Sequence, residues 1–247
     1  MAPTVVLISG ANRGLGKGLL ARFLARPNHI VIAANRNPSH PTSKSLATLP
    51  KGRDSRLIVI KIDATIESDA SDGIKQLRAQ GIEHLDVVIA NAGVSYAWPK
   101  VSELTTVDLM GHLTPDLLGV IWLYQATFSL LKKSANPRWI TMGSVAGKFQ
   151  EQPDVANTAY AIPKAAAHWV TKRINQEEDW LTATVIHPGW VLTDMGAAAS
   201  KGTGIPPENF NTSLDDSCDG MVRLIDVATK ESQGGKFFGW EGEPESW

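Results

Sequence analysis

Tyr160 and Lys164 are four positions apart, so on a helix their side chains share one face. A free phenol titrates near pKa ~10, too high for an efficient acid or base at neutral pH, and a nearby ammonium lowers that pKa by favouring the phenolate. Ser144 carries a hydroxyl that can hydrogen-bond a carbonyl oxygen and hold it beside Tyr160. Taken singly, such residues are usually surface groups or caps. Together they predict proton transfer at a carbonyl group.

A glycine-rich stretch lies near the start of the chain, where residues 9–16 read SGANRGLG. Gly10, Gly14 and Gly16 allow a tight turn between a strand and a helix. The backbone can then approach a pyrophosphate at the helix N-terminus. Three glycines could also make a plain turn, but the apolar run before them and the helical pattern after them favour a dinucleotide site. An ATP-type phosphate loop is excluded because Gly18, which has no hydroxyl, follows Lys17.

The elements that position the tyrosine, lysine, serine and glycines are expected to start from short runs rich in valine and isoleucine. Such runs are typical of strands buried on both faces, and stretches with helical spacing separate them. The runs are residues 5–8, 30–32, 57–60, 87–89, 139–141 and 183–186. Repeated strand–helix–strand units with right-handed crossovers predict an α/β fold, a Rossmann-type doubly wound parallel sheet with helices on both faces. We expect residues 1–247 to form a single domain with its ligand at the carboxyl ends of the strands.

Composition excludes several other classes of function. The chain has 247 residues, 43% of them hydrophobic, and 24 Lys and Arg balance 25 Asp and Glu, so nucleic acid is not an expected partner. Cys218 stands alone and the six histidines form no metal-binding pattern, so we expect neither disulfides nor a metal site. There is no signal-type segment and no apolar stretch of the roughly 18 residues that span a membrane. A cytoplasmic protein without membrane contact is predicted.

A predicted helix over residues 113–133 carries apolar side chains in most directions around its axis. Such a helix must be buried on nearly all sides. A second subunit or other elements of the same chain could bury it, and the oligomer is slightly favoured. We therefore expect a homo-oligomer, either a dimer or a tetramer.

The order of the motifs resembles the short-chain dehydrogenase/reductase family over almost the whole chain. The glycines are spaced Gly-x-x-x-Gly-x-Gly, and four later motifs follow, each after its expected strand. These are residues 91–93 (NAG), Ser144, the pair Tyr160 and Lys164, and residues 187–193 (HPGWVLT). Residues 9–14, 88–93 and 187–196 more narrowly resemble fungal ketoreductases similar to norsolorinic acid ketoreductase. The resemblance implies about seven strands and hydride transfer from a nicotinamide to a ketone carbon, with Tyr160 protonating the oxygen and Lys164 reaching the ribose.

The cofactor is expected to be NADP(H). NAD enzymes place an acidic residue near the end of the second strand, but residues 33–36 read AANR, and Arg36 can meet a 2′-phosphate with help from Arg13. Arg36 could instead be a solvated turn residue. Asp63 matches an adenine-contacting position of the family, although it could equally be a helix cap. The expected cofactor-binding residues are Gly10, Asn12, Arg13, Gly14, Leu15, Gly16, Arg36, Asp63, Asn91, Gly93, Tyr160, Lys164, Pro188, Gly189, Val191 and Thr193.

Two positions depart from the family pattern. Asp116 stands where the family has an asparagine that helps a water relay reach the active-site lysine. We expect Asp116 to take part in catalysis: ionised, it would weaken the effect of Lys164 on Tyr160, and neutral, it could still relay protons. An aspartate that simply substitutes for asparagine is an equal alternative. Pro163 directly precedes Lys164, so the helix should begin shortly before Tyr160, and Tyr160 could be displaced slightly relative to Lys164.

Aromatic residues follow several of the motifs at the expected ligand edge. Tyr96, Trp98, Phe149 and Trp190 are the predicted substrate contacts, and residues 193–211 form a predicted lid. A bulky apolar ketone of secondary metabolism, similar to a polyketide or alkaloid, is the expected substrate. The alternatives are a repurposed enzyme that uses bound NADP(H) in a non-redox or bifunctional cyclisation or isomerisation, and an NADP(H) sensor without turnover.

Overall fold

The computed structural model describes residues 2–247, and its centre is one seven-stranded sheet. All strand pairs are parallel, and the order is β3-β2-β1-β4-β5-β6-β7. The strands are β1 (Thr4–Ser9), β2 (His29–Asn35), β3 (Arg56–Lys61), β4 (Val87–Ala90), β5 (Arg138–Met142), β6 (Thr182–His187) and β7 (Phe237–Gly239). The order reverses between β1 and β4, which opens a crevice at their carboxyl ends.

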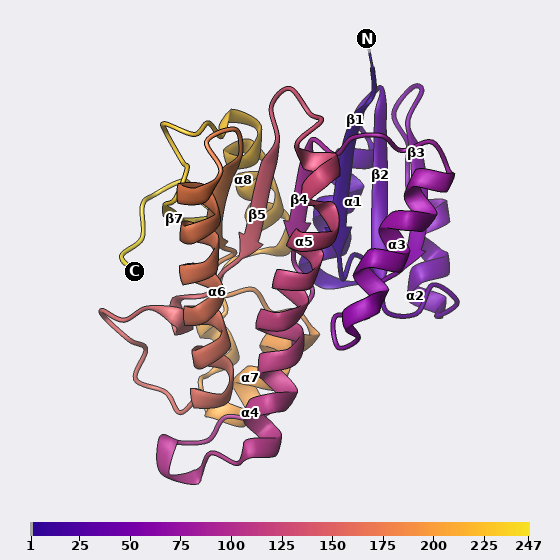
Figure 1. Cartoon of the computed structure of the whole chain (residues 1–247). Coiled ribbons are helices and arrows are strands. Elements are labelled where there is room, and N and C mark those ends of the chain that lie inside the picture. The colour runs from indigo at the N-terminus through magenta and orange to yellow at the C-terminus, as the bar shows by residue number, and fades with distance from the viewer. Residues whose placement is uncertain (1) are drawn as a thin grey trace.

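Helices cover both faces of this sheet, as Figure 1 shows, with α3, α5 and α6 on one face and α1 and α8 on the other. The helices are α1 (Gly14–Leu24), α2 (Pro41–Lys44), α3 (Glu67–Ala79), α4 (Thr106–Leu113), α5 (Gly119–Leu131), α6 (Thr158–Glu177), α7 (Asp194–Thr203) and α8 (Leu214–Val227). Helices α4 and α7 lie beyond the carboxyl ends of the strands (Figure 1). Within residues 2–247, no helix is long and apolar enough to cross a membrane.

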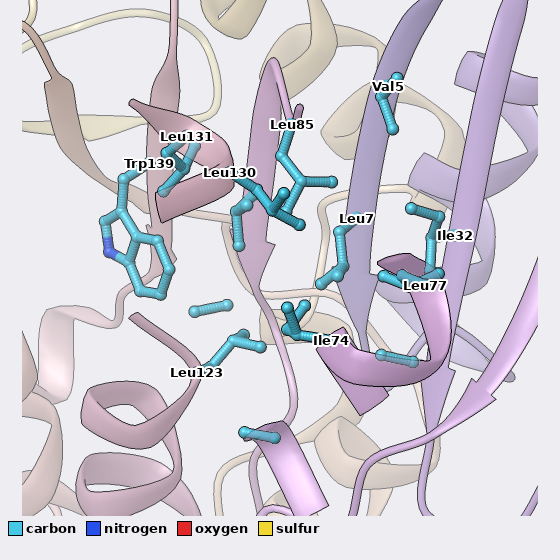
Figure 2. Packing of buried hydrophobic residues seen from close by; sticks show 14 of the residues in the cluster. Val5, Leu7, Ile32, Ile74, Leu77, Leu85, Leu123, Leu130, Leu131 and Trp139 are labelled. Carbon is cyan, nitrogen blue, oxygen red and sulfur yellow. The ribbon is translucent and has the colours of Figure 1, made fainter. Parts of the chain in front are cut away.

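Two clusters of buried apolar side chains hold the layers together, one on each face of the sheet. On the first face, Figure 2 shows Leu77 of α3 beside Leu7 and Ile32 of the sheet, and Leu130 of α5 beside Leu85. Alternate residues of one strand serve opposite faces, because successive side chains of a strand point in opposite directions. Packed helices therefore support the sheet on both faces, including the carboxyl ends of its strands.

The α/β architecture predicted from the apolar runs is confirmed, since all six runs lie inside observed strands. The seventh strand, β7, has only three residues, too few for a periodic pattern to stand out. The long apolar helix is confirmed as helical, but it is composed of α4, a π-helical segment (Thr114–Leu118) and α5. The π-helical turn widens the helix where Asp116 lies.

Candidate active site

The glycine loop after β1 has the geometry of a phosphate cradle. Gly10 and Gly14 adopt positive φ angles of 65° and 52°, which residues other than glycine rarely adopt. A Cβ on Gly16 would overlap the Gly10 carbonyl oxygen and the Asn91 side chain. Asn91 Nδ2 donates to the carbonyl oxygens of Ser9 and Gly10 at 2.8 and 3.2 Å. The residue that follows β4 therefore fixes the backbone at the start of the loop.

The start of α1 leaves its first N–H groups available to an anion. Arg13 occupies the N-cap position and its side chain makes no capping hydrogen bond. Those donors and the helix dipole fit a pyrophosphate of the predicted dinucleotide. Next to the loop, buried Asn35 accepts from the Ala11 N–H at 2.9 Å, and exposed Arg36 follows at the end of β2. The backbone and the positive side chain therefore suit a nicotinamide dinucleotide.

Ser144 is held at two points just beyond β5. Its backbone N–H donates to His168 Nε2 at 3.2 Å, and its Oγ accepts from the Ala146 N–H at 3.2 Å. Because Oγ acts as the acceptor in that turn, its own proton remains available to a substrate oxygen. Ser144 and Tyr160 line the same pocket.

Tyr160 and Lys164 lie on one face of α6, two residues into the helix and one turn further on. Lys164 is buried, with Nζ 5.4 Å from the centre of the Tyr160 ring and donating to the Met142 carbonyl oxygen at 3.1 Å. The helix begins at Thr158, shortly before Tyr160, as expected from a proline at position 163. Pro163 thus leaves the tyrosine and the lysine facing each other.

Asp116 is completely buried within the π-helical segment and approaches this pair. Oδ1 accepts from the Val94 N–H at 2.9 Å, while Oδ2 has no hydrogen-bond partner among the described residues. A Cβ on Gly93 would overlap Asp116 Oδ1 and lie 3.6 Å from Lys164 Nζ, so a glycine is needed where these groups converge. Burial raises the pKa of Asp116 to about 6, although the charge of Lys164 opposes that rise.

Asp116→Asn should therefore remove a pH dependence of stability. The native carboxyl, with a pKa near 6, binds protons more tightly than the unfolded one near 3.8. Wild-type stability must then fall as pH rises through that window, by up to about 3 kcal/mol. The asparagine variant should not show this fall, so at pH 8 its free energy of unfolding should be the larger one, and below about pH 4 the two should agree. Urea unfolding across pH measures this, and equal slopes in both proteins would contradict it.

The pocket beside Ser144 and Tyr160 has a volume of about 150 Å³. Trp98 and Trp190, two of the predicted substrate contacts, form part of its wall, and α7 closes it with Met195, Gly196, Ala199 and Thr203. Two predicted aromatic contacts lie elsewhere. Tyr96 stacks on His112, with ring centres 4.2 Å apart, and Phe149 is 76% exposed in the connection that follows β5. Neither ring belongs to the pocket wall that the structure describes.

The other predicted cofactor residues lie around the same edge. Leu15, Pro188, Gly189, Val191 and Thr193 line the pocket, and Thr193 also caps α7. Asn12 and Asp63 hydrogen-bond to other side chains of the protein, Asn12 to α2 and Asp63 within its own turn. Asn12 donates to Thr42 Oγ1 at 2.6 Å, whereas Asp63 Oδ1 accepts from the N–H and hydroxyl of Thr65. Asp63 therefore lies in the turn before α3, but the N-cap of α3 is Ile66, so Asp63 is not the helix cap of the alternative interpretation.

Sequence reasoning missed three buried histidines around the site. His112 Nε2 accepts from the Tyr96 N–H at 3.2 Å, which fixes the connection after β4. His168 supports Ser144, and His187 lines the pocket with Nδ1 unpartnered among the described residues. Burial lowers the pKa of His168 to about 3 and that of His187 to about 4, so both rings are neutral near pH 7. Only His187, inside the HPG motif, carried a signal in the sequence.

Known proteins resemble the chain in sequence over most of its length. A family model described as short chain dehydrogenase matches residues 4–204. A norsolorinic acid ketoreductase of Dothistroma septosporum is 37% identical, over 95% of this chain and 88% of that protein. A second, from Emericella nidulans, is 36% identical over 95% of this chain and 89% of its own length.

Solved structures show the same arrangement. The NADPH-bound carbonyl reductase from chicken fatty liver superimposes with a TM-score of 0.86 at 25% identity, covering 100% of both chains. The carbonyl reductase Sniffer of Drosophila melanogaster gives a TM-score of 0.85 at 26% identity, over 99% of this chain and 100% of that one. These similarities extend over the sheet, the glycine loop and the connections that form the pocket.

Proposed function

Because the chain belongs to the short-chain dehydrogenase family, whose members are oxidoreductases that use a nicotinamide cofactor, we propose that it is an NADPH-dependent ketoreductase. Its substrate would be a bulky, apolar ketone of secondary metabolism. One observation carries the proposal furthest: Ser144 and Tyr160 face one pocket next to the glycine loop, and buried Lys164 lies behind Tyr160.

Each of these side chains has a distinct task in ketone reduction. Bound NADPH supplies the hydride. The Ser144 hydroxyl donates to the carbonyl oxygen and fixes its position, while the Tyr160 hydroxyl gives that oxygen a proton as negative charge develops. The ammonium of Lys164 stabilises the phenolate that remains on Tyr160. Asp116 interacts electrostatically with Lys164, and its unpartnered Oδ2 is available to take part in a proton relay.

The preference for NADPH is assigned to Arg36, with Arg13 as a second contact. Arg36 is exposed at the end of β2, beside the glycine loop. Arg13 pairs with Asp194 at 3.2 Å, and both of these side chains are largely exposed. An exposed pair of this kind is worth little, so Arg13 can exchange Asp194 for a phosphate at low cost.

Arg36→Ala should raise the KM for NADPH about 10- to 100-fold, because a charge-assisted contact with the 2′-phosphate is lost. The KM for NADH, which lacks that phosphate, should change less than about 2-fold. Initial rates with each cofactor measure the effect. Arg53→Ala is the matched control, since Arg53 is also exposed but pairs with Asp54 away from the loop. An equal rise for both cofactors would refute the assignment.

The substrate pocket must open before a bulky ketone can enter. Its volume of about 150 Å³ is below the roughly 300–1,000 Å³ of typical ligand pockets. Trp98 packs directly against Gly202 of α7, where any Cβ would overlap the indole. We assign residues 193–211 as a lid within one domain of residues 1–247, with Trp98 as its contact on the opposite wall. Lid opening then accompanies substrate entry.

A panel of bulky aromatic and alicyclic ketones tests the proposed activity. Loss of NADPH absorbance with at least one ketone, and formation of the matching alcohol, are the expected results. Tight NADPH binding without turnover on any ketone would favour a sensor. A second enzymatic candidate is a non-redox cyclisation or isomerisation, favoured by the buried carboxyl of Asp116, whose pKa near 6 suits a proton-abstracting base.

We further propose a cytoplasmic homo-oligomer, a dimer or a tetramer. Val107 on α4 and Trp169 on α6 are 79% and 65% exposed, and large apolar side chains on a surface often mark subunit contacts. Light scattering should give a mass of at least twice 26.7 kDa. A monomer at micromolar concentration would contradict this proposal.

A further inference from the structure

His168 is a buried side chain that hydrogen-bonds to the backbone of Ser144. It lies on α6, one turn beyond Lys164, and is 2% exposed. Its Nε2 accepts the Ser144 N–H at 3.2 Å. An amide can only donate, so Nε2 carries a lone pair and the neutral ring bears its proton on Nδ1. The hydrogen bond therefore specifies both the charge and the tautomer of His168.

Two glycines flank Ser144 where α6 and the His168 ring pack closely against this turn. A Cβ on Gly143 would lie 2.4 Å from Val185 Cγ1 and 2.9 Å from His168 Nε2. A Cβ on Gly147 would lie 2.8 Å from the backbone of Lys164 and Ala165 and 2.9 Å from His168 Cε1. All these distances are too short for a real carbon contact, so the imidazole is one of the groups that pack directly against the turn that presents Ser144.

Aromatic residues from the other end of the chain cover the same imidazole. The ring centres of Phe237 and Trp247 lie 4.7 and 6.1 Å from that of His168. Lys172 Nζ lies 4.8 Å from the Trp247 ring centre, and the Gln150 N–H donates to the Trp247 carbonyl oxygen at 3.2 Å. Burial, with a further contribution from the positive charge of Lys164, lowers the pKa of His168 to about 3. Among the described residues Nδ1 has no hydrogen-bond partner, and every group that shifts the pKa of the ring lowers it, so a second proton is disfavoured.

We propose that His168 is a positioning residue for the carbonyl-binding serine: its unprotonated Nε2 fixes the Ser144 backbone, and Phe237 and Trp247 keep the ring dry. This inference rests on the proposed reductase activity. With its N–H donated to His168 and its Oγ accepting from Ala146, Ser144 keeps only its hydroxyl proton for the substrate. Loss of the histidine contact would leave the partly buried Ser144 N–H unpaired, and the turn would shift to find another partner.

The activity test uses a matched pair of substitutions. His168→Gln places an acceptor oxygen at the same bond count from Cβ as Nε2, whereas His168→Leu fills the space without an acceptor. We expect His168→Leu to lower kcat/KM about 30-fold, because small misplacement of a binding group has large effects on rate, and His168→Gln to recover most of that loss. The NADPH Kd should stay within about 2-fold in both variants. Equal activity of the glutamine and leucine variants would overturn the proposal.

A double-mutant cycle separates positioning from general damage to the fold. In a Ser144→Ala background the hydroxyl is already absent, so adding His168→Leu should lower kcat/KM by less than about 2-fold. A further loss close to 30-fold in that background would mean that His168 acts on something other than Ser144, and would overturn the proposal. His112→Leu, which removes a different backbone acceptor, should reduce activity additively with Ser144→Ala.

A spectroscopic test does not depend on any catalytic activity. Long-range ¹H–¹⁵N spectra of the wild-type protein should show His168 as the neutral Nδ1–H tautomer from pH 5 to pH 8. In Trp247→Ala, where water reaches the ring, its amide and imidazole shifts should begin to titrate within that range. An Nε2–H tautomer in the wild type would refute the proposal even if ketone reduction is observed. The expected tautomer in a protein that reduces no ketone would instead locate the failure in the proposed function.

Discussion

Tyr160→Phe should lower kcat/KM for ketone reduction about 1,000-fold, within the range that a positioned acid contributes to catalysis. Only the hydroxyl oxygen is removed. The remaining ring can keep its place on α6, with Lys164 Nζ 5.4 Å from its centre in the wild type. Hydride donation would then leave a developing alkoxide without a proton source. Binding of NADPH, followed by fluorescence, should change less than about 2-fold, because the glycine loop is untouched.

Tyr124→Phe is the matched control for this substitution. Tyr124 lies on α5 and packs edge-on against Phe128 and Trp139, away from the pocket. Loss of its hydroxyl should leave kcat/KM within about 2-fold of the wild type. If Tyr160→Phe kept more than a tenth of wild-type activity, Tyr160 would not be the proton donor and the assignment of the site would be wrong.

Lys164→Met should lower kcat/KM about 100- to 1,000-fold, because the positive charge that stabilises a phenolate on Tyr160 disappears. Methionine fills most of the buried space, so the fold should survive. The charge of Lys164 also holds down the pKa of Asp116, so the Asp116 carboxyl should titrate above about 6 in the variant. The pH dependence of kcat/KM, and of stability, measures both effects.

The control for Lys164→Met is Lys132→Met, at the C-terminal end of α5. Lys132 is exposed and lies over Phe128 and Trp180, outside the pocket. The Lys132→Met substitution should leave kcat/KM and its pH dependence unchanged. Unaltered kcat/KM in Lys164→Met would show that the buried ammonium plays no part in the chemistry. An unchanged Asp116 titration would show that the two groups do not interact.

The sheet and the glycine loop could be predicted because local sequence determines them. Runs such as residues 87–89 are short, rich in valine and isoleucine and apolar on both faces, which is typical of a covered parallel strand. Gly16 is required by a contact with the carbonyl oxygen of Gly10, only six residues earlier. The pairing of Tyr160 with Lys164 needs nothing beyond the period of one helix. The motif order then placed Ser144 at the same edge.

The features that escaped prediction depend on contacts between distant segments. Tyr96 follows the β4 motif as a substrate contact should, but its N–H is bound by His112 and its ring stacks there. His168 accepts the backbone N–H of Ser144, which is 24 residues earlier in the chain. The burial that shifts the pKa of Asp116 depends on the π-helical turn, which no periodicity indicates. Tertiary context, rather than residue type, decides each of these cases.

Transfer of deuterium is the most direct test of the central claim. The protein is incubated with each bulky ketone and with NADPH that carries deuterium at both C4 positions of the nicotinamide, and the product is analysed by mass spectrometry. A reductase must yield an alcohol carrying one deuterium at the former carbonyl carbon, with one equivalent of NADP⁺ formed. A product of unchanged composition with intact NADPH, or no product despite NADPH binding, would contradict the claim.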